Sequence, residues 1–218
     1  MCLSVLQLFD DEVLNIYNTV KAKYEAMGPD KYKRFIHIEG VCQMASYLAN
    51  EYHVNLKDAQ IAALLHDYYK YETPEEMSKV LSKEEIEECT LCPVLFHAYS
   101  SSKVLKKLFN IDNKEIETAI KYHVFGHPKM SMLDKIILIS DYTEINRTYK
   151  DCQEVRKILL GGHLDLAILV STRNIINLLL KENKKEKYFA FLYIYAYNKN
   201  IKAKRDKILK IKEKEGFL

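Results

Sequence analysis

Apolar residues recur at intervals of three and four through almost the whole chain, as in Val13, Ile16, Tyr17 and Val20. This spacing is typical of amphipathic helices, in which such residues share one face. The chain also contains only six Gly and four Pro. So few turn formers cannot separate the many short strands of a β-sandwich or barrel. The pattern therefore predicts an all-α protein of about nine helices.

Helix-breaking sequences interrupt this pattern at only a few places. They are MGPD at 27–30, TPEE at 73–76, CPVL at 92–95, FGHPKMS at 125–131 and Gly161-Gly162. Thr73 is expected to cap a helix whose first residue is Pro74. No internal repeat, low-complexity segment or long linker divides the chain, so we expect one helical bundle over residues 1–200.

The charge of the chain is unevenly distributed. Residues 181–218 hold twelve of the 33 Lys and Arg but only five of the 30 Asp and Glu, which leaves the rest of the chain slightly acidic. In KILKIKEKEGF the charges alternate with apolar residues, and no nucleic-acid-binding motif precedes them. We interpret residues 201–218 as a basic helical extension or tail and expect no nucleic-acid partner.

Composition places the chain among globular proteins, since 48% of its residues are hydrophobic and 29% are charged. No apolar run approaches the ~20 residues of a membrane-spanning helix, and the first residues carry acids where a signal peptide would carry Lys or Arg. We therefore expect a cytoplasmic protein that does not associate with membranes. Cys89 and Cys92 form a CxxC without a second pair, and we interpret them as two partly buried thiols.

The segment IAALLHDYYK at 61–70 carries ionisable residues directly after an apolar helix face. On a helix that continues through residue 70, His66 and Lys70 lie four residues apart and share a face, while Asp67 lies about 100° round the axis. Burying a charged side chain beside an apolar stripe costs on the order of several kcal/mol unless the charge is paired or binds a metal. Metal coordination would explain their position.

Isolated histidine or aspartate residues lie in apolar helical segments at four further places. Each alone is explained by a hydrogen-bonded core histidine or a capping aspartate. Together with residues 66 and 67 they supply the imidazole and carboxylate groups that suit a transition metal of intermediate hardness. The candidate metal ligands are His37, His66, Asp67, His97, His123 and Asp141.

The chain resembles the His-Asp (HD) phosphohydrolase superfamily and, within it, the YqeK-type symmetrical diadenosine tetraphosphate hydrolases. The order of histidine and aspartate residues indicates only the superfamily, whereas the pattern YHxxGxPxMSxLxKIIxxxDYxExxR is more specific. The resemblance covers about residues 10–200 and implies a single HD-domain helical bundle with a dinuclear metal site. It is carried by RFIHIEGV at 34–41, AALLHDYYK at 62–70, LFHAYSS at 95–101, AIKYHVFGHPKMSMLDKIILISDYTEINR at 119–147, LDLAI at 164–168 and AYN at 196–198.

The resemblance also implies roles for individual residues. Asp67 would bridge two metal ions, one held with His37, His66 and Asp141 and the other with His97 and His123. We expect iron, with manganese, cobalt or magnesium as alternatives. Asp67 and Lys70 are the predicted catalytic residues. Lys70 would lie over the scissile phosphate, and the guanidinium of Arg147 would bind phosphate.

Three positions depart from the family's pattern. The family has HTTGRP where this chain has HVFGHP at 123–128, so hydroxyls and an arginine that could contact phosphate are missing. His127 is predicted to replace that arginine as a phosphate donor when it is protonated. Ser101 stands where a glycine is common, and Ile145 stands where a proline is common. None of these changes removes an implied metal ligand.

The function that the resemblance implies is hydrolysis of diadenosine tetraphosphate to two ADP by metal-activated water. The sequence leaves three alternatives open: hydrolysis of another nucleotide, a metal- and nucleotide-binding protein with reduced catalysis, and a purely structural helical protein. It also leaves open whether the chain forms a homodimer. The predicted substrate contacts are Lys70, His127 and Arg147.

Overall fold

The computed structural model describes residues 9–127 and 129–181, and within these ranges it contains eleven helices and no β-strand. The prediction of an all-α fold is confirmed. The number exceeds the expected nine, in part because α7, with six residues, is too short to show a periodic pattern. The helices are α1 (Asp11–Ala26), α2 (Pro29–Glu51), α3 (Leu56–Leu65), α4 (Pro74–Ser78), α5 (Lys83–Leu91), α6 (Leu95–Ser102), α7 (Val104–Phe109), α8 (Lys114–Lys121), α9 (Met132–Thr143), α10 (Lys150–Leu160) and α11 (Leu164–Lys181).

Short polar side chains cap the starts of several helices. Thr73 caps α4, as predicted, because its hydroxyl accepts a hydrogen bond from the backbone N–H of Glu76, and Pro74 is the first helical residue. Ser131 caps α9 in a reciprocal arrangement with Asp134, in which each side chain accepts from the other residue's backbone N–H. This cap fixes where α9 begins, and α9 carries Asp141.

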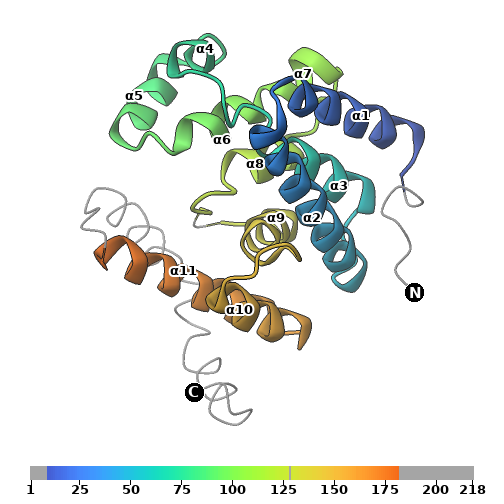
Figure 1. Cartoon of the computed structure of the whole chain (residues 1–218), viewed down its shortest axis with the longest axis vertical. Helices are drawn as coiled ribbons and strands as arrows, with labels where there is room; N and C mark the ends of the chain where they lie inside the picture. The colour runs from blue at the N-terminus through green and yellow to red at the C-terminus, as the bar shows by residue number, and fades with distance from the viewer. Residues whose placement is uncertain (1–8, 128, 182–218) are drawn as a thin grey trace.

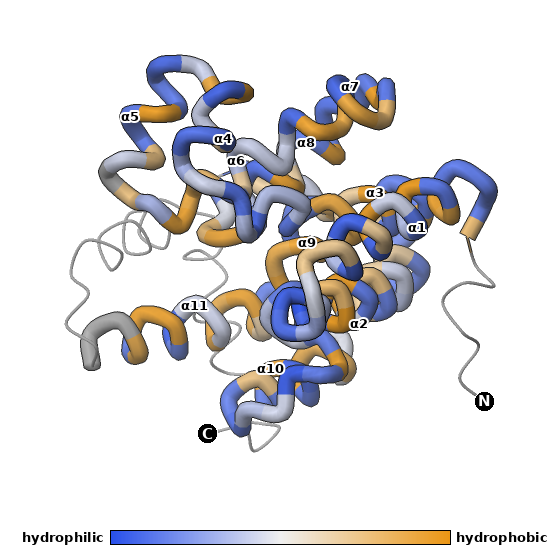
Figure 2. The backbone as a smooth tube through the Cα atoms, turned by 45° about the horizontal axis from the view of Figure 1, so that its top comes forward, coloured by the Kyte–Doolittle hydropathy of each residue, from blue (hydrophilic) through white to orange (hydrophobic). Residues whose placement is uncertain are grey.

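Helix α9 lies near the middle of the molecule, between α1–α3 on one side and α10–α11 on the other (Figure 1). The main core joins these helices through fully buried side chains such as Tyr24, Phe35, Leu64 and Ile136. Hydrophobic and hydrophilic residues alternate along the helical tubes, as expected for helices with one buried face (Figure 2). The packing therefore sets α2, α3 and α9 firmly against one another.

Two smaller apolar clusters lie outside the main core. Met77 and Phe96 belong to the first cluster, which holds α4–α6 together (upper left in Figure 1). In the second, Phe125 from the loop after α8 packs with Cys92 and with Ile175 of α11. This second cluster connects α11 with the segment between α5 and α6, next to the loop that follows α8.

Some predictions fall outside the described ranges or concern only part of them. The domain boundary at residue 200, the tail 201–218 and the AYN segment at 196–198 are not described by the structure and stay predictions. Cys89 and Cys92 are both buried. Among the helices of residues 9–127 and 129–181, none is both long enough and apolar enough to cross a membrane.

Candidate metal centre and active site

Helix α3 ends at Leu65, so the prediction of one helix through residues 61–70 is wrong. A continuing helix would need the N–H of Tyr69 for the carbonyl of Leu65, but this N–H donates instead to Ser101 Oγ on α6, at 3.0 Å. The chain turns tightly here, with the N–H of Lys70 donating to the carbonyl of Asp67 at 2.8 Å. His66 and Asp67 therefore lie at the end of a buried helix, and Lys70 lies on the turn that follows.

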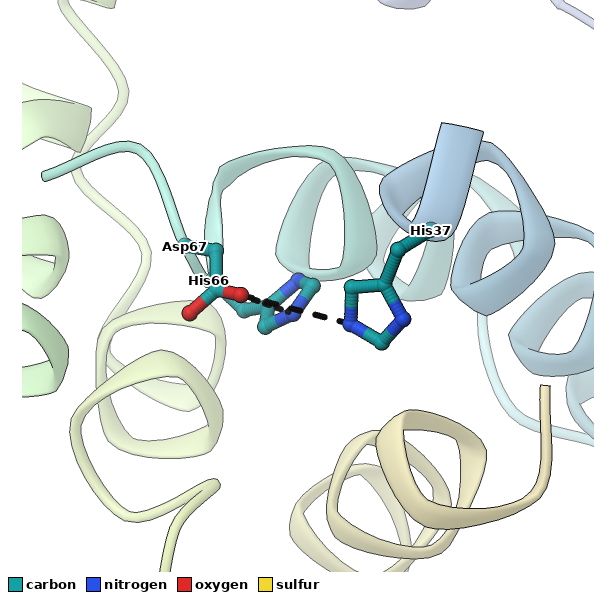
Figure 3. A group of neighbouring side chains, drawn as sticks. All are labelled: His37, His66 and Asp67. Carbon is teal, nitrogen blue, oxygen red and sulfur yellow. Dashed lines mark ion pairs between the residues drawn. The ribbon is translucent and has the colours of Figure 1, made fainter. Parts of the chain in front are cut away.

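The six candidate ligands come from separate parts of the chain and converge on Asp67. One group contains His37 from α2 and His66, whose Nε2 atoms lie 4.0 and 3.4 Å from Asp67 Oδ2 (Figure 3). Asp141 from α9 joins this group, because its Oδ1 lies 2.9 Å from the Nε2 of His37. These side chains point toward a common centre between α2, α3 and α9.

The second group uses the other oxygen of Asp67. The Nε2 atoms of His97 and His123 lie 3.1 and 3.7 Å from Asp67 Oδ1, and 3.3 Å from each other. One carboxylate thus presents Oδ2 to the first group and Oδ1 to the second. This is the arrangement expected of a carboxylate shared by two neighbouring cations.

Hydrogen bonds to the backbone orient two of the histidine rings. The Nδ1 of His66 lies 2.7 Å from the carbonyl of Ala63, and the Nδ1 of His123 lies 2.8 Å from the carbonyl of Ile120. A carbonyl only accepts, so each Nδ1 carries the proton and each Nε2 keeps its lone pair for the cluster. The Nε2 of His66 and the Oδ1 of Asp67 are buried and make no hydrogen bond. Buried acceptor atoms without donors fit a metal ion.

The pKa values of the cluster also suit a cation. Burial by itself would raise the pKa of the Asp67 carboxyl, but the neighbouring His66 and Lys70 hold it well below its usual range. Burial lowers the pKa of His97, and burial together with the neighbouring His66 and His97 lowers that of His123 to about 3. At neutral pH the structure therefore presents an ionised carboxylate and two neutral imidazoles.

In the first ligand group, the pKa of Asp141 is lowered and that of His37 is raised. Burial would raise the pKa of Asp141, but contacts with His37 and Arg147 hold it well below its usual range. For His37, burial favours the neutral ring, yet the carboxylates of Asp141 and Glu144 outweigh it and raise its pKa. The first group thus concentrates negative charge around His37.

Three cationic side chains surround the two aspartates. Arg34 donates to Asp67 Oδ2 at 3.0 Å, and Arg147 donates to Asp141 Oδ1 at 2.9 Å. The Nζ of Lys70 lies 3.4 Å from Asp67 Oδ1 and 3.0 Å from the Nε2 of His97. The structure therefore places Lys70 and Arg147 at the edge of the cluster, and their assignment to phosphate stays a prediction. Arg147 also has a buried Nε without a hydrogen-bond partner.

A cavity adjoins the cluster, and its volume of about 720 Å³ is within the range of ligand-binding pockets. Five residues at or beside the cluster line it: Lys70, His97, His123, Asp141 and Arg147. The remaining walls are mostly apolar and aromatic and come from the residue before α6, the loop after α8, α9, the start of α10 and α11. They include Val94, Val124, Phe125, Tyr142, Tyr149, Asn174, Ile175 and Leu178.

His127 does not line this cavity. Its Nε2 lies 2.9 Å from Oδ2 of Asp134, the residue that completes the cap of α9, and its ring packs on Tyr122 with 4.7 Å between ring centres. The structure thus separates His127 from the side chains with which the sequence grouped it. Val124 and Phe125, which replace the family's threonines, contribute apolar surface to the cavity wall.

Sequence reasoning missed residues that act through their neighbours. Glu144 lies beside His37, and Arg156 donates to the backbone carbonyls of Thr143, Glu144 and Arg147. Ser101, noted only as a departure from the family, ends α3 by accepting the N–H of Tyr69. An acidic residue at the end of an apolar helix was a usable signal for Glu144, but no sequence signal connected Arg156 or Ser101 with the site.

Comparison with known proteins identifies this arrangement. The HD domain family matches residues 34–146, which contain all six candidate ligands. The chain is 35% identical over 153 residues to the symmetrical bis(5'-nucleosyl)-tetraphosphatase of Bacillus subtilis, covering 69% of this chain and 82% of that protein. It is 29% identical to the protein of the same name from Staphylococcus aureus, covering 84% of this chain and 91% of that one.

A solved structure agrees with these matches. The crystal structure of a Clostridium acetobutylicum protein, titled a predicted HD superfamily hydrolase involved in NAD metabolism, superposes with a TM-score of 0.68 at 29% sequence identity. The match covers 83% of this chain and 97% of that one. The chain belongs to the HD domain superfamily and, within it, to the family of symmetrical bis(5'-nucleosyl)-tetraphosphatases.

Proposed function

We propose that this chain is a metal-dependent hydrolase that cleaves diadenosine tetraphosphate symmetrically into two ADP. The observation that carries the proposal is the division of five ligands into two groups that share Asp67, beside a cavity lined by Lys70 and Arg147. Its relatives from Bacillus subtilis and Staphylococcus aureus are named for this reaction, which supports the same substrate here.

The donor set supports two divalent metal ions, with His37, His66, Asp67 and Asp141 as ligands of one and Asp67, His97 and His123 as ligands of the other. Imidazole and carboxylate donors without thiolate suit iron, manganese or cobalt, and we propose iron. When bound, two such ions would supply a nucleophilic water near neutral pH and neutralise the oxygens of the phosphate whose phosphorus this water attacks.

The residues of the chain have separate tasks in this proposal. Lys70 neutralises the charge that develops on the scissile phosphate, because its ammonium lies between the second ligand group and the cavity. Arg147 holds the phosphate chain in ground and transition states, because its side chain lines the cavity. No side-chain nucleophile takes part, so no covalent intermediate forms on the protein.

The bonds that change define a direct test. Water adds to one of the two inner phosphorus atoms, the bridge between these two atoms breaks, and the bridging oxygen leaves on the second ADP. In ¹⁸O-labelled water, the metal-loaded protein should yield two ADP per substrate, with one label in one of the two. Asymmetric cleavage would instead yield ATP and AMP.

A nucleotide panel separates the remaining readings. Two ADP from diadenosine tetraphosphate, released faster than products from mononucleotides or other dinucleotides, supports the proposal. Faster turnover of another nucleotide would show that this nucleotide is the substrate, and the proposed metal centre would still stand. Tight binding of ADP without turnover of any compound in the panel would replace the enzyme by a nucleotide-binding protein.

A further inference from the structure

Glu144 is a buried carboxylate that has no place in the proposed reaction. It follows the last residue of α9, and only 2% of its surface is exposed. Its Oε1 lies 3.3 Å from the Nδ1 of His37, and its Oε2 accepts the backbone N–H of Asn146 at 2.6 Å. Both oxygens are therefore engaged, one of them by a candidate metal ligand. Burying a carboxylate costs on the order of several kcal/mol, and these contacts offset part of that cost.

The neighbouring helix leaves room for this carboxylate at Gly40. Gly40 follows His37 by three residues on α2, so both lie on the same helix face. A Cβ atom at residue 40 would lie 2.2 Å from Oε2 of Glu144 and 2.9 Å from Nδ2 of Asn146. Any side chain at residue 40 would thus displace the carboxylate. The glycine is needed here for close approach rather than for backbone conformation.

The backbone around Glu144 is also held in place. Arg156 from α10 donates to the carbonyls of Thr143, Glu144 and Arg147, the last at 2.8 Å. The Nδ2 of Asn146 donates to the carbonyl of Ile36, the residue before His37, at 3.2 Å. The carboxylate is therefore fixed from both sides relative to the ring of His37.

This contact differs from those of the other oriented histidines. The Nδ1 atoms of His66 and His123 face backbone carbonyls, which are neutral, whereas the Nδ1 of His37 faces a carboxylate. A carboxylate behind a metal-binding imidazole fixes the ring and makes its other nitrogen a stronger donor to the metal. The histidine that faces a carboxylate therefore belongs to the ligand group that also contains Asp141.

We propose that Glu144 is a positioning residue for the metal position that contains His37, and that Gly40 provides the space in which it acts. The proposal rests on the proposed metal centre but not on the identity of the nucleotide. Glu144 touches neither the metal nor the substrate in this account. Its effect passes through the orientation and donor strength of the His37 ring.

The test measures metal binding rather than turnover. Metal-free wild type, Glu144→Gln and Glu144→Ala are titrated with Co²⁺ by calorimetry, and the visible absorption of bound cobalt reports the ligand geometry. Both variants should bind cobalt ~10–100-fold more weakly at one position and alter its absorption bands. Glu144→Gln should lose less than Glu144→Ala, because an amide oxygen can still accept from the ring.

Assigning the weakened position needs a background with one complete group. In His123→Ala only the group with His37 keeps all its ligands, and Glu144→Gln should weaken cobalt binding there by the same factor. Glu154→Gln is the matched control, because Glu154 is an exposed residue of α10, and its cobalt binding should equal that of wild type. Thermal unfolding of each metal-free variant separates loss of folding from loss of affinity.

A double-mutant cycle tests the contribution of Gly40. Gly40→Ala should weaken cobalt binding about as much as Glu144→Ala, but should have little further effect when Glu144 is already alanine. Wild-type affinity and absorption in both Glu144 variants would overturn the proposal. Equal weakening at both metal positions, or an undiminished effect of Gly40→Ala in the Glu144→Ala background, would do so as well. An incorrect substrate assignment would change none of these results.

Discussion

The ligand cluster and the far wall of the cavity are built on different principles. In the cluster, Asp67 is 1% exposed, and side chains from distant parts of the sequence surround it within 4 Å. The far wall consists mainly of apolar and aromatic side chains, among which Tyr149 is 73% exposed and Leu178 is 53% exposed. Chemistry depends on a few atoms held in place, whereas the wall offers surface that can adjust to a ligand.

This difference sets an order of expected effects. Changes in the shared carboxylate should affect both metal positions. Changes in the phosphate contacts should affect either kcat or KM. Changes in the far wall should affect substrate affinity alone.

Asp67→Asn should have the largest effect, because it replaces a shared, ionised oxygen by an amide that cannot bridge two cations. We expect loss of both metal ions and a drop in turnover beyond the ~10³-fold cost of losing a single donor. Metal analysis after gel filtration and a turnover assay measure the two effects. Retention of both ions with near-normal turnover would show that Asp67 does not bridge.

Lys70→Ala should lower kcat by ~10²–10³-fold while both metal ions remain bound, because Lys70 is assigned to charge that develops during the reaction. Lys33→Ala is the control, since Lys33 is an exposed lysine of α2 that pairs with Asp30. Steady-state kinetics and metal analysis of the same samples measure the outcome. Loss of metal in Lys70→Ala would move this residue from the substrate to the ligand cluster.

Arg147→Ala should mainly raise KM, by about tenfold or more, since a charged hydrogen bond contributes ~1.5–3 kcal/mol in both ground and transition states. His127→Ala tests the predicted phosphate contact, whose loss should also raise KM. The observed pairing with Asp134 favours the other outcome, an unchanged KM with lower thermal stability. Steady-state kinetics and thermal unfolding of His127→Ala distinguish the two.

Tyr149→Ala should raise KM by about fivefold and leave kcat and metal content unchanged. A base stacked on an aromatic ring contributes ~1–3 kcal/mol, and the exposure of Tyr149 places it at the low end of that range. Tyr47→Ala is a matched control, because Tyr47 is an exposed tyrosine of α2 that does not line the cavity. A large loss of kcat in Tyr149→Ala would remove the distinction between wall and cluster.

The pH dependence of the metal-free protein should report the buried rings. Burial lowers the pKa of His97 and His123, the latter to about 3, whereas unfolded histidine titrates near ~6.5. Between these values the unfolded chain binds protons that the folded chain does not, so the free energy of unfolding falls as pH is lowered below about 6.5. The contribution of His37, whose pKa is raised, is fully present throughout this window.

Thermal unfolding after chelation, at pH 6.5, 5.5 and 4.5, measures this loss. The window lies above the pH at which the two aspartates, with lowered pKa values, take up protons. His123→Asn should unfold with a weaker dependence on pH than wild type. An identical dependence would show that His123 does not carry the effect.

The sequence predicted the cluster better than the wall for a physical reason. His66 and Asp67 interrupt an apolar stripe, and such an interruption is visible in a linear pattern because burial of charge needs a cause. Tyr149 and Leu178 look like ordinary helix residues, and only the packing of α10 and α11 against the loop after α8 makes them a wall. Lys70 was placed beside Asp67 correctly in space, although the helix that was assumed to carry it ends at Leu65.

Other features could not be read from the sequence because they are contacts between distant backbones. The N–H of Tyr69 turns away from α3 to Ser101, which lies 32 residues later. His127 looked like a phosphate donor because it stands where the family has an arginine, yet its partner is Asp134 in the cap of α9. Local spacing predicts helices and their caps, but not which partner a polar atom finds in the folded chain.

The metal content of protein purified without chelator tests the central claim most directly. The account predicts two transition-metal ions per chain in wild type, measured by elemental analysis against protein concentration, and loss of both in Asp67→Asn. Wild-type protein without bound metal, or an Asp67→Asn variant that keeps two ions, would contradict a dinuclear centre built around Asp67.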